Sequence, residues 1–127
     1  MFLMLYTLTN KDFEYRYSDI YKGYFISLNL DTKALFEKMP RAKVNVNIET
    51  IYDKINVVGI DYNGFEGFEI DTLTIMGEES AFYILDKSLY DTRLQTLKYS
   101  QGITIDYSAD AFNNEFLEVV VWNGIPM

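Results

Sequence analysis

The stretch from Lys54 to Leu73 (KINVVGIDYNGFEGFEIDTL) constrains the fold most, because it joins an apolar run, a glycine turn and an alternating segment. The β-branched run over residues 55–60 is typical of a strand buried on both faces. Asn63-Gly64 then favours a tight turn, since these residue types tolerate positive φ. Residues 68–71 alternate apolar and acidic side chains, which predicts a half-buried strand whose carboxylates face water.

The same two-residue alternation recurs at residues 13–17, 24–29, 43–48 and 103–107, and predicts a protein built mostly of short strands. Residues 2–8 are also expected to form a strand, and residues 115–122 carry the strongest strand signal of the chain. Turns at 10–12 and 100–102 would join neighbouring strands as hairpins, while residues 92–99 fit either a helix or a strand. No internal repeat is evident.

Two segments show helical features. The first covers residues 31–39, with Asp31 as a good N-cap and Pro40 as a stop. The second covers residues 78–90, with two glutamates in its first turn and an apolar face at i, i+3 and i+7. We therefore expect a single α+β domain spanning residues 1–127, with a mostly antiparallel sheet and about two helices.

Composition excludes several chemistries. The chain has no cysteine and no histidine, so it lacks a thiolate nucleophile, the commonest general base and most transition-metal ligands. Residues 61–72 begin like a calcium loop, but Phe65 and Glu66 occupy positions that require an oxygen ligand and a glycine. We expect no enzyme activity, no cofactor and no metal. An enzyme that uses carboxylates, with or without a metal, remains an alternative.

The negative charge is concentrated in the second part of the chain. Residues 1–54 carry seven acids and eight bases, whereas residues 55–127 carry twelve acids and three bases. Such a chain will not bind nucleic acid or an anionic membrane by charge, and a basic protein surface is the expected partner. Because the N-terminal residues have no basic leader and no run long enough to span a membrane, we expect a cytoplasmic protein.

The acids that follow the central strand are the candidate partner-binding residues. On a strand, carboxylates two residues apart lie about 6.8 Å apart on one face, and such a row can imitate a nucleic-acid backbone. A solvated strand face is the alternative interpretation of these residues. The predicted partner-binding set is Asp61, Tyr62, Glu66, Glu69, Asp71, Glu78, Glu79 and Asp86.

Residues 23–82 resemble part of the ArdA-type antirestriction proteins. The segments YFISLNL, DTKALFEKM and GIDYNGFEGFEID are similar to that family's strand, acidic-flanked helix, and strand–turn–acidic strand, and a helix from Glu78 would follow. The resemblance implies a DNA-mimicking inhibitor carried by a mobile element. It implies mimic charges at Asp61, Glu66, Glu69, Asp71, Glu78 and Glu79.

The charge layout and the resemblance together predict a small acidic inhibitor encoded by a phage or another mobile element. Its target would be a restriction or CRISPR nuclease, or another defence protein that handles nucleic acid. The inhibitor would occupy a basic groove by steric and electrostatic mimicry. An immunity-type or accessory phage module that binds protein without mimicry is the alternative.

Overall fold

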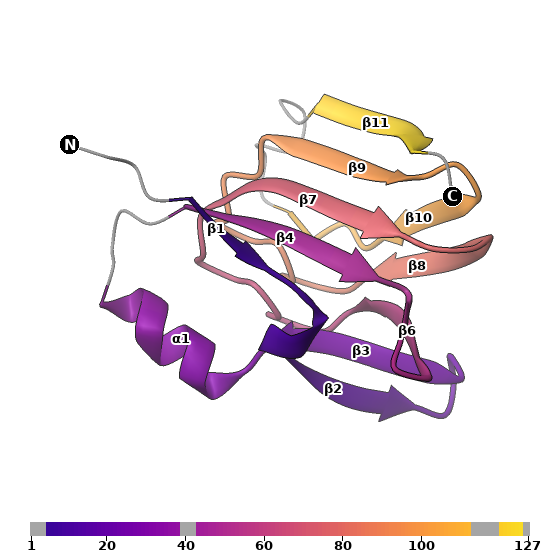
Figure 1. The fold of residues 1–127 in the computed structure, drawn as a ribbon, viewed down its shortest axis with the longest axis horizontal. Helices are drawn as coiled ribbons and strands as arrows, with labels where there is room; N and C mark the ends of the chain where they lie inside the picture. Colours follow the sequence, from indigo (N-terminus) through magenta and orange to yellow (C-terminus); the bar gives the residue numbers. More distant parts are fainter. Residues whose placement is uncertain (1–4, 39–42, 113–119, 126–127) are drawn as a thin grey trace.

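A computed structural model describes residues 5–38, 43–112 and 120–125 (Figure 1). Within these residues the chain forms one α-helix, one short 3₁₀ helix and eleven strands. Their bounds are β1 Leu5–Leu8, η1 Asn10–Asp12, β2 Phe13–Ser18, β3 Gly23–Leu28, α1 Leu30–Glu37, β4 Lys43–Glu49, β5 Ile51–Tyr52, β6 Ile55–Ile60, β7 Ile70–Met76, β8 Ser80–Ile84, β9 Thr96–Ser100, β10 Ile103–Tyr107 and β11 Val120–Ile125.

The strands form two stacked sheets with mostly parallel pairing. The front sheet has the order β1-β4-β7-β9-β11, and all its pairs are parallel. The back sheet has the order β10-β8-β6-β3-β2, where only β2 and β3 pair antiparallel. The short β5 adds an antiparallel pair to β6. The α+β class is confirmed, and the mostly antiparallel sheet is wrong.

From β3 onward, the strands of the two sheets alternate between front and back along the chain, which explains the parallel pairing. From β4 to β11 the chain runs along the front sheet, crosses to the back sheet, returns, and starts the next coil above the last (Figure 1). The turn at residues 100–102 therefore joins strands of different sheets instead of closing a hairpin. Alternation in the sequence shows that one face of a strand is buried. It does not identify which other strand forms hydrogen bonds with it in the sheet.

Successive coils in the C-terminal half are offset by 24 residues at three of the strand pairs, and by 23 between β8 and β10, where Ser80 pairs with Ile103. Gly59 pairs with Tyr83, and Thr72 pairs with Thr96. β9 and β11 keep the same offset from Thr96 to Val120. The absence of an internal repeat is therefore wrong, and the chain is a solenoid of stacked coils around one core.

The core lies between the two sheets. Front-sheet side chains such as Val46 and Leu73 face back-sheet side chains such as Ile26, Ile60 and Phe82, all 0% exposed. One cluster of buried apolar residues extends through the described coils from Leu8 to Ala111.

The first predicted helix is confirmed and the second is wrong. α1 begins after Asn29, whose side chain accepts a hydrogen bond from the Thr32 amide at 2.8 Å, so Asn29 and not Asp31 is the N-cap. The predicted end at residue 39 lies outside the described residues. Residues 78–90 form a turn, β8 and the start of a loop. Phe82 and Ile84 are buried on either side of half-exposed Tyr83, and this strand alternation prevails over the helical spacing.

Candidate functional site

The solenoid has two edges, each built from the connections between sheets. The loop edge carries the connections that lead from the back sheet to the front sheet, which are residues 29–38 with α1, 61–69, 85–95 and 108–112. The turn edge carries residues 19–22, 50–54, 77–79 and 101–102. In Figure 1 the loop edge lies on the left and the turn edge on the right. β7 separates them, and its seven residues span about 20 Å.

The loops on the loop edge stack in register. The Asn63 amide donates to the Asp86 carbonyl at 3.2 Å, and the Gly67 amide donates to the Tyr90 carbonyl at 3.0 Å. Asn63 and Lys87, 24 positions apart, both adopt positive φ (58° and 56°). The two loops therefore follow one backbone path, and side chains of successive coils become neighbours.

This stacking brings six of the eight predicted residues to one edge. Asp61, Tyr62, Glu66 and Glu69 lie in the first loop, with Asp71 at the start of β7 and Asp86 in the next loop. Glu78 and Glu79 lie in the turn before β8, on the turn edge. The predicted set is thus divided between two opposite edges.

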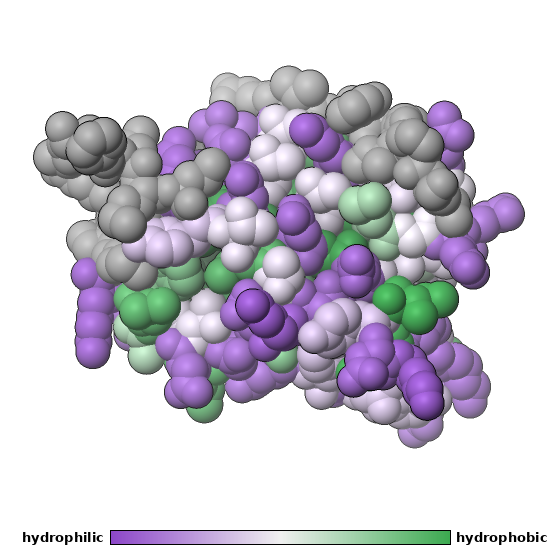
Figure 2. Space-filling model, viewed as in Figure 1, coloured by the Kyte–Doolittle hydropathy of each residue, from purple (hydrophilic) through white to green (hydrophobic). Residues whose placement is uncertain are grey.

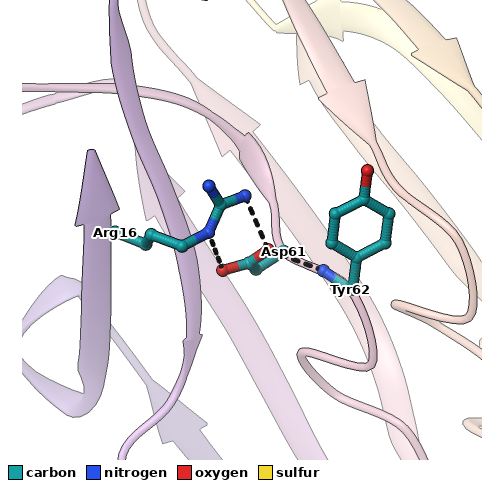
Figure 3. Close-up of polar contacts among 3 residues, drawn as sticks. All are labelled: Arg16, Asp61 and Tyr62. Atoms are coloured by element: carbon teal, nitrogen blue, oxygen red, sulfur yellow. Dashed lines mark hydrogen bonds and ion pairs between the residues drawn. The ribbon is translucent and has the colours of Figure 1, made fainter. Parts of the chain in front are cut away.

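Asp61 forms an ion pair with Arg16 of β2 (Figure 3). Arg16 Nε and Nη2 donate to the two carboxylate oxygens of Asp61 at 2.8 and 2.9 Å, and the guanidinium lies 5.2 Å from the centre of the Phe25 ring. Hydrogen bonding to Asp61 raises the pKa of Arg16 above its ordinary value. The ion pair offsets the charge of Asp61.

Tyr62 lies on the side of Asp61 away from the guanidinium (Figure 3), and its side chain is 57% exposed. Its amide donates to Asp61 Oδ1 at 2.9 Å, which fixes the backbone beneath the ring. A large, exposed ring on a fixed backbone is suited to contact a partner at low entropic cost.

The other acids of the loop edge differ in their surroundings. Glu69 lies 3.6 Å from Arg93, both partly solvated, so this contact contributes little stability. Thr72 Oγ1 donates to Asp71 at 3.2 Å. Glu66 accepts a hydrogen bond from the Asn63 amide group.

Glu66 and Asp86 are both exposed, and within the described part of the chain neither forms an ion pair. Sequence reasoning missed two further acids of this edge, Asp91 and Asp110. The 24-residue spacing was the signal that could have placed them. Over residues 61–71, 85–95 and 108–112 there are seven carboxylates against Lys87 and Arg93, with Arg16 of β2 nearby. The loop edge therefore keeps a negative excess.

Sequence reasoning also missed a groove on the turn edge. It encloses about 390 Å³ between the end of β4, the turn after β7 and the end of β9. Glu78 lines it together with Glu49, Ile51 and Met76. No spacing rule points to this groove, because its walls come from three coils.

Two negative findings concern the described residues alone. They contain no group of three or more aspartate, glutamate, histidine or cysteine side chains placed to hold a metal ion. No helix among them has the length and apolarity needed to cross a membrane.

The fold is a solenoid of stacked coils, in which equivalent positions of successive coils become neighbours on each edge. Comparisons with models of known protein families, with curated proteins and with solved structures found no match to this chain.

Proposed function

We infer that this protein is a non-enzymatic binding module that contacts a basic protein surface through its loop edge. One observation carries the proposal. The stacking of two coils brings Glu66 and Asp86 to the edge that also bears the exposed Tyr62, and neither carboxylate is in an ion pair within the described residues.

The physical roles divide between these side chains. Tyr62 offers apolar area and a hydroxyl, which is the composition typical of interface hot spots. The carboxylates attract a basic partner during diffusional encounter and disfavour acidic partners. Because exposed charges are screened by salt, the association rate should fall as ionic strength rises.

The narrower proposal names the partner as a restriction or CRISPR nuclease, or another nucleic-acid-handling defence protein. It is supported by the ArdA-type resemblance of residues 23–82 and by the negative excess of the loop edge. In this form Glu66, Asp71 and Asp86 are the mimic charges.

The alternative is an immunity-type or accessory module that binds protein without mimicry. Arg16 and Arg93 favour it, because they interrupt the acids of the loop edge at Asp61 and Glu69. The two glutamates on the turn edge also favour it, since they lie about a strand length from the other acids.

The test measures inhibition of DNA cleavage by a panel of purified restriction and CRISPR nucleases. The wild-type protein is compared with a Glu66→Gln/Asp86→Asn variant of the loop edge. A matched control, Asp53→Asn/Glu79→Gln, removes the same charge from the turn edge. We expect inhibition of at least one nuclease, a roughly tenfold loss in the loop-edge variant, and a normal response in the control.

Three results would count against the proposal. They are the absence of inhibition across the panel, inhibition that salt does not weaken, and an equal loss in the two variants. Binding to a toxin domain, without an effect on any nuclease, would support the alternative, in which the protein binds another protein but does not mimic nucleic acid.

A further inference from the structure

The groove on the turn edge has a fixed floor. The Thr50 amide donates to the Met76 carbonyl at 2.9 Å, and the Gly77 amide donates to Ser100 Oγ at 3.1 Å. Thr50 and Ser100 are almost fully buried. These contacts tie three coils together, so the groove exists before anything binds in it.

The walls of the groove combine apolar and acidic side chains. Ile51 and Met76 are 57% and 43% exposed, while Glu49 and Glu78 are exposed carboxylates, and none of the described residues that line the groove is basic. Figure 2 shows a strongly hydrophobic patch ringed by hydrophilic surface on the right-hand side, where the turn edge lies. The groove is therefore complementary to an apolar side chain that has a cationic neighbour.

The chain itself carries that combination on the same edge. The β2–β3 connection, residues 19–22, presents Ile20 with 87% of its surface exposed, between an exposed Asp19 directly before it and an exposed Lys22 two residues later. We call these four residues the hairpin tip. An exposed isoleucine at a projecting turn stands out, because such residue types are most often buried.

The hairpin tip is held firmly beneath its exposed isoleucine. The ring of Tyr21 packs on Phe25 and Tyr83, with centroids 5.3 and 4.5 Å apart. The Tyr21 amide donates to Ser18 Oγ at 3.2 Å. A braced tip loses little conformational entropy when it docks.

We propose that the turn edge is a self-association surface, in which the hairpin tip of one copy occupies the groove of a second copy. Ile20 contacts Ile51 and Met76 of the other molecule, and Lys22 pairs with Glu49 and Glu78. Because the tip and the groove lie on the same edge, the tip of each copy can bind in the groove of the other copy. The result is a closed dimer with two-fold symmetry. The loop edges of both copies remain exposed.

The experiment is sedimentation velocity over roughly three decades of protein concentration. We expect a reversible dimer that Ile20→Ser weakens by roughly tenfold or more. Leu35→Ser is the control: it removes another exposed apolar side chain, 55% exposed, from α1 and should leave the dimer unchanged. All these positions are exposed, so the variants should fold, and circular dichroism checks that they do.

A charge exchange tests the contact itself. Lys22→Glu and Glu78→Lys should each weaken the dimer, and the two together should restore it. A protein that stays monomeric at every concentration, a dimer indifferent to Ile20→Ser, or an exchange without recovery would overturn the proposal. A synthetic SDIYKG peptide copies residues 18–23, so it should bind in the groove and compete with the dimer; a peptide that does neither would also count against the proposal.

Discussion

Replacing Gly77 by alanine should destabilise the protein through a single identified clash. A Cβ built at Gly77 would lie 1.8 Å from Thr50 Oγ1 and 2.9 Å from Thr50 Cβ, and its three nearest neighbours all belong to that side chain. Thr50 is 3% exposed, and its amide is bonded to the Met76 carbonyl, so it has little room to withdraw. Overpacking of this kind costs about 1–3 kcal/mol.

The net change is smaller, because alanine also restricts the unfolded chain. That effect stabilises by about 0.4–1 kcal/mol where the backbone conformation is accessible, and Gly77 does not have positive φ. We therefore expect Gly77→Ala to lower the free energy of unfolding by up to about 2.6 kcal/mol. The measurement is urea unfolding, with the midpoint reduced and the m-value unchanged.

A double-mutant cycle with Thr50→Ala isolates the clash. Truncating Thr50 removes the Oγ1 and Cγ2 atoms that the new methyl group meets, so Gly77→Ala should cost less in the Thr50→Ala background than in the wild type. A coupling energy of about 1 kcal/mol or more is expected. If the two changes are additive, the close approach of Gly77 to Thr50 does not govern this position, and the reasoning is refuted.

Three other perturbations follow from single contacts. Phe65 is fully buried on the loop edge, so Phe65→Ala should lower the free energy of unfolding by about 3–5 kcal/mol in urea titrations. Asn29→Ala removes the N-cap of α1 and should cost about 1 kcal/mol, with a matching loss of helical circular dichroism. Burial raises the pKa of Tyr15 above its model-compound value of 10.0, so above about pH 10 the folded state holds more protons than the unfolded state. Stability should therefore decline as the pH rises through the folded pKa, and this part of the decline should be absent in Tyr15→Phe.

The sequence predicted most strands but not their partners. The alternation in residues 103–107 and the apolar run in residues 55–60 correspond to β10 and β6, because burial of one or both faces leaves a local trace. The pairing of strands from successive coils leaves no such pattern among residues that are close together in the sequence. It becomes visible only when positions 24 residues apart are compared, as with Phe65 and Leu89, which fill equivalent places in the core.

The wrong helix at residues 78–90 has a related cause. Phe82, Leu85 and Leu89 fit helical spacing, yet only Phe82 belongs to a strand, while the other two lie in the following loop. Leu89 is buried because its loop lies between the loops of the neighbouring coils: the Phe65 amide donates to the Ser88 carbonyl at 2.8 Å, and the Leu89 amide donates to the Ala111 carbonyl at 3.0 Å. A loop that stacks in register buries apolar residues as a helix does, so periodicity cannot separate the two in a solenoid.

Stacking also explains why charge counted along the chain gives only part of the candidate site. Glu69 and Arg93 belong to different segments of the sequence, yet they occupy equivalent positions 24 residues apart and lie 3.6 Å from each other. Arg16 reaches Asp61 from another strand of the back sheet. In each case the fold brings a base from a distant segment to an acid that appeared unopposed in the sequence. Inward positions of the coils are mostly apolar, whereas outward positions are free to vary from coil to coil. The carboxylates that a partner would meet are therefore set by how the coils stack, and Glu66 and Asp86 remain the clearest pair.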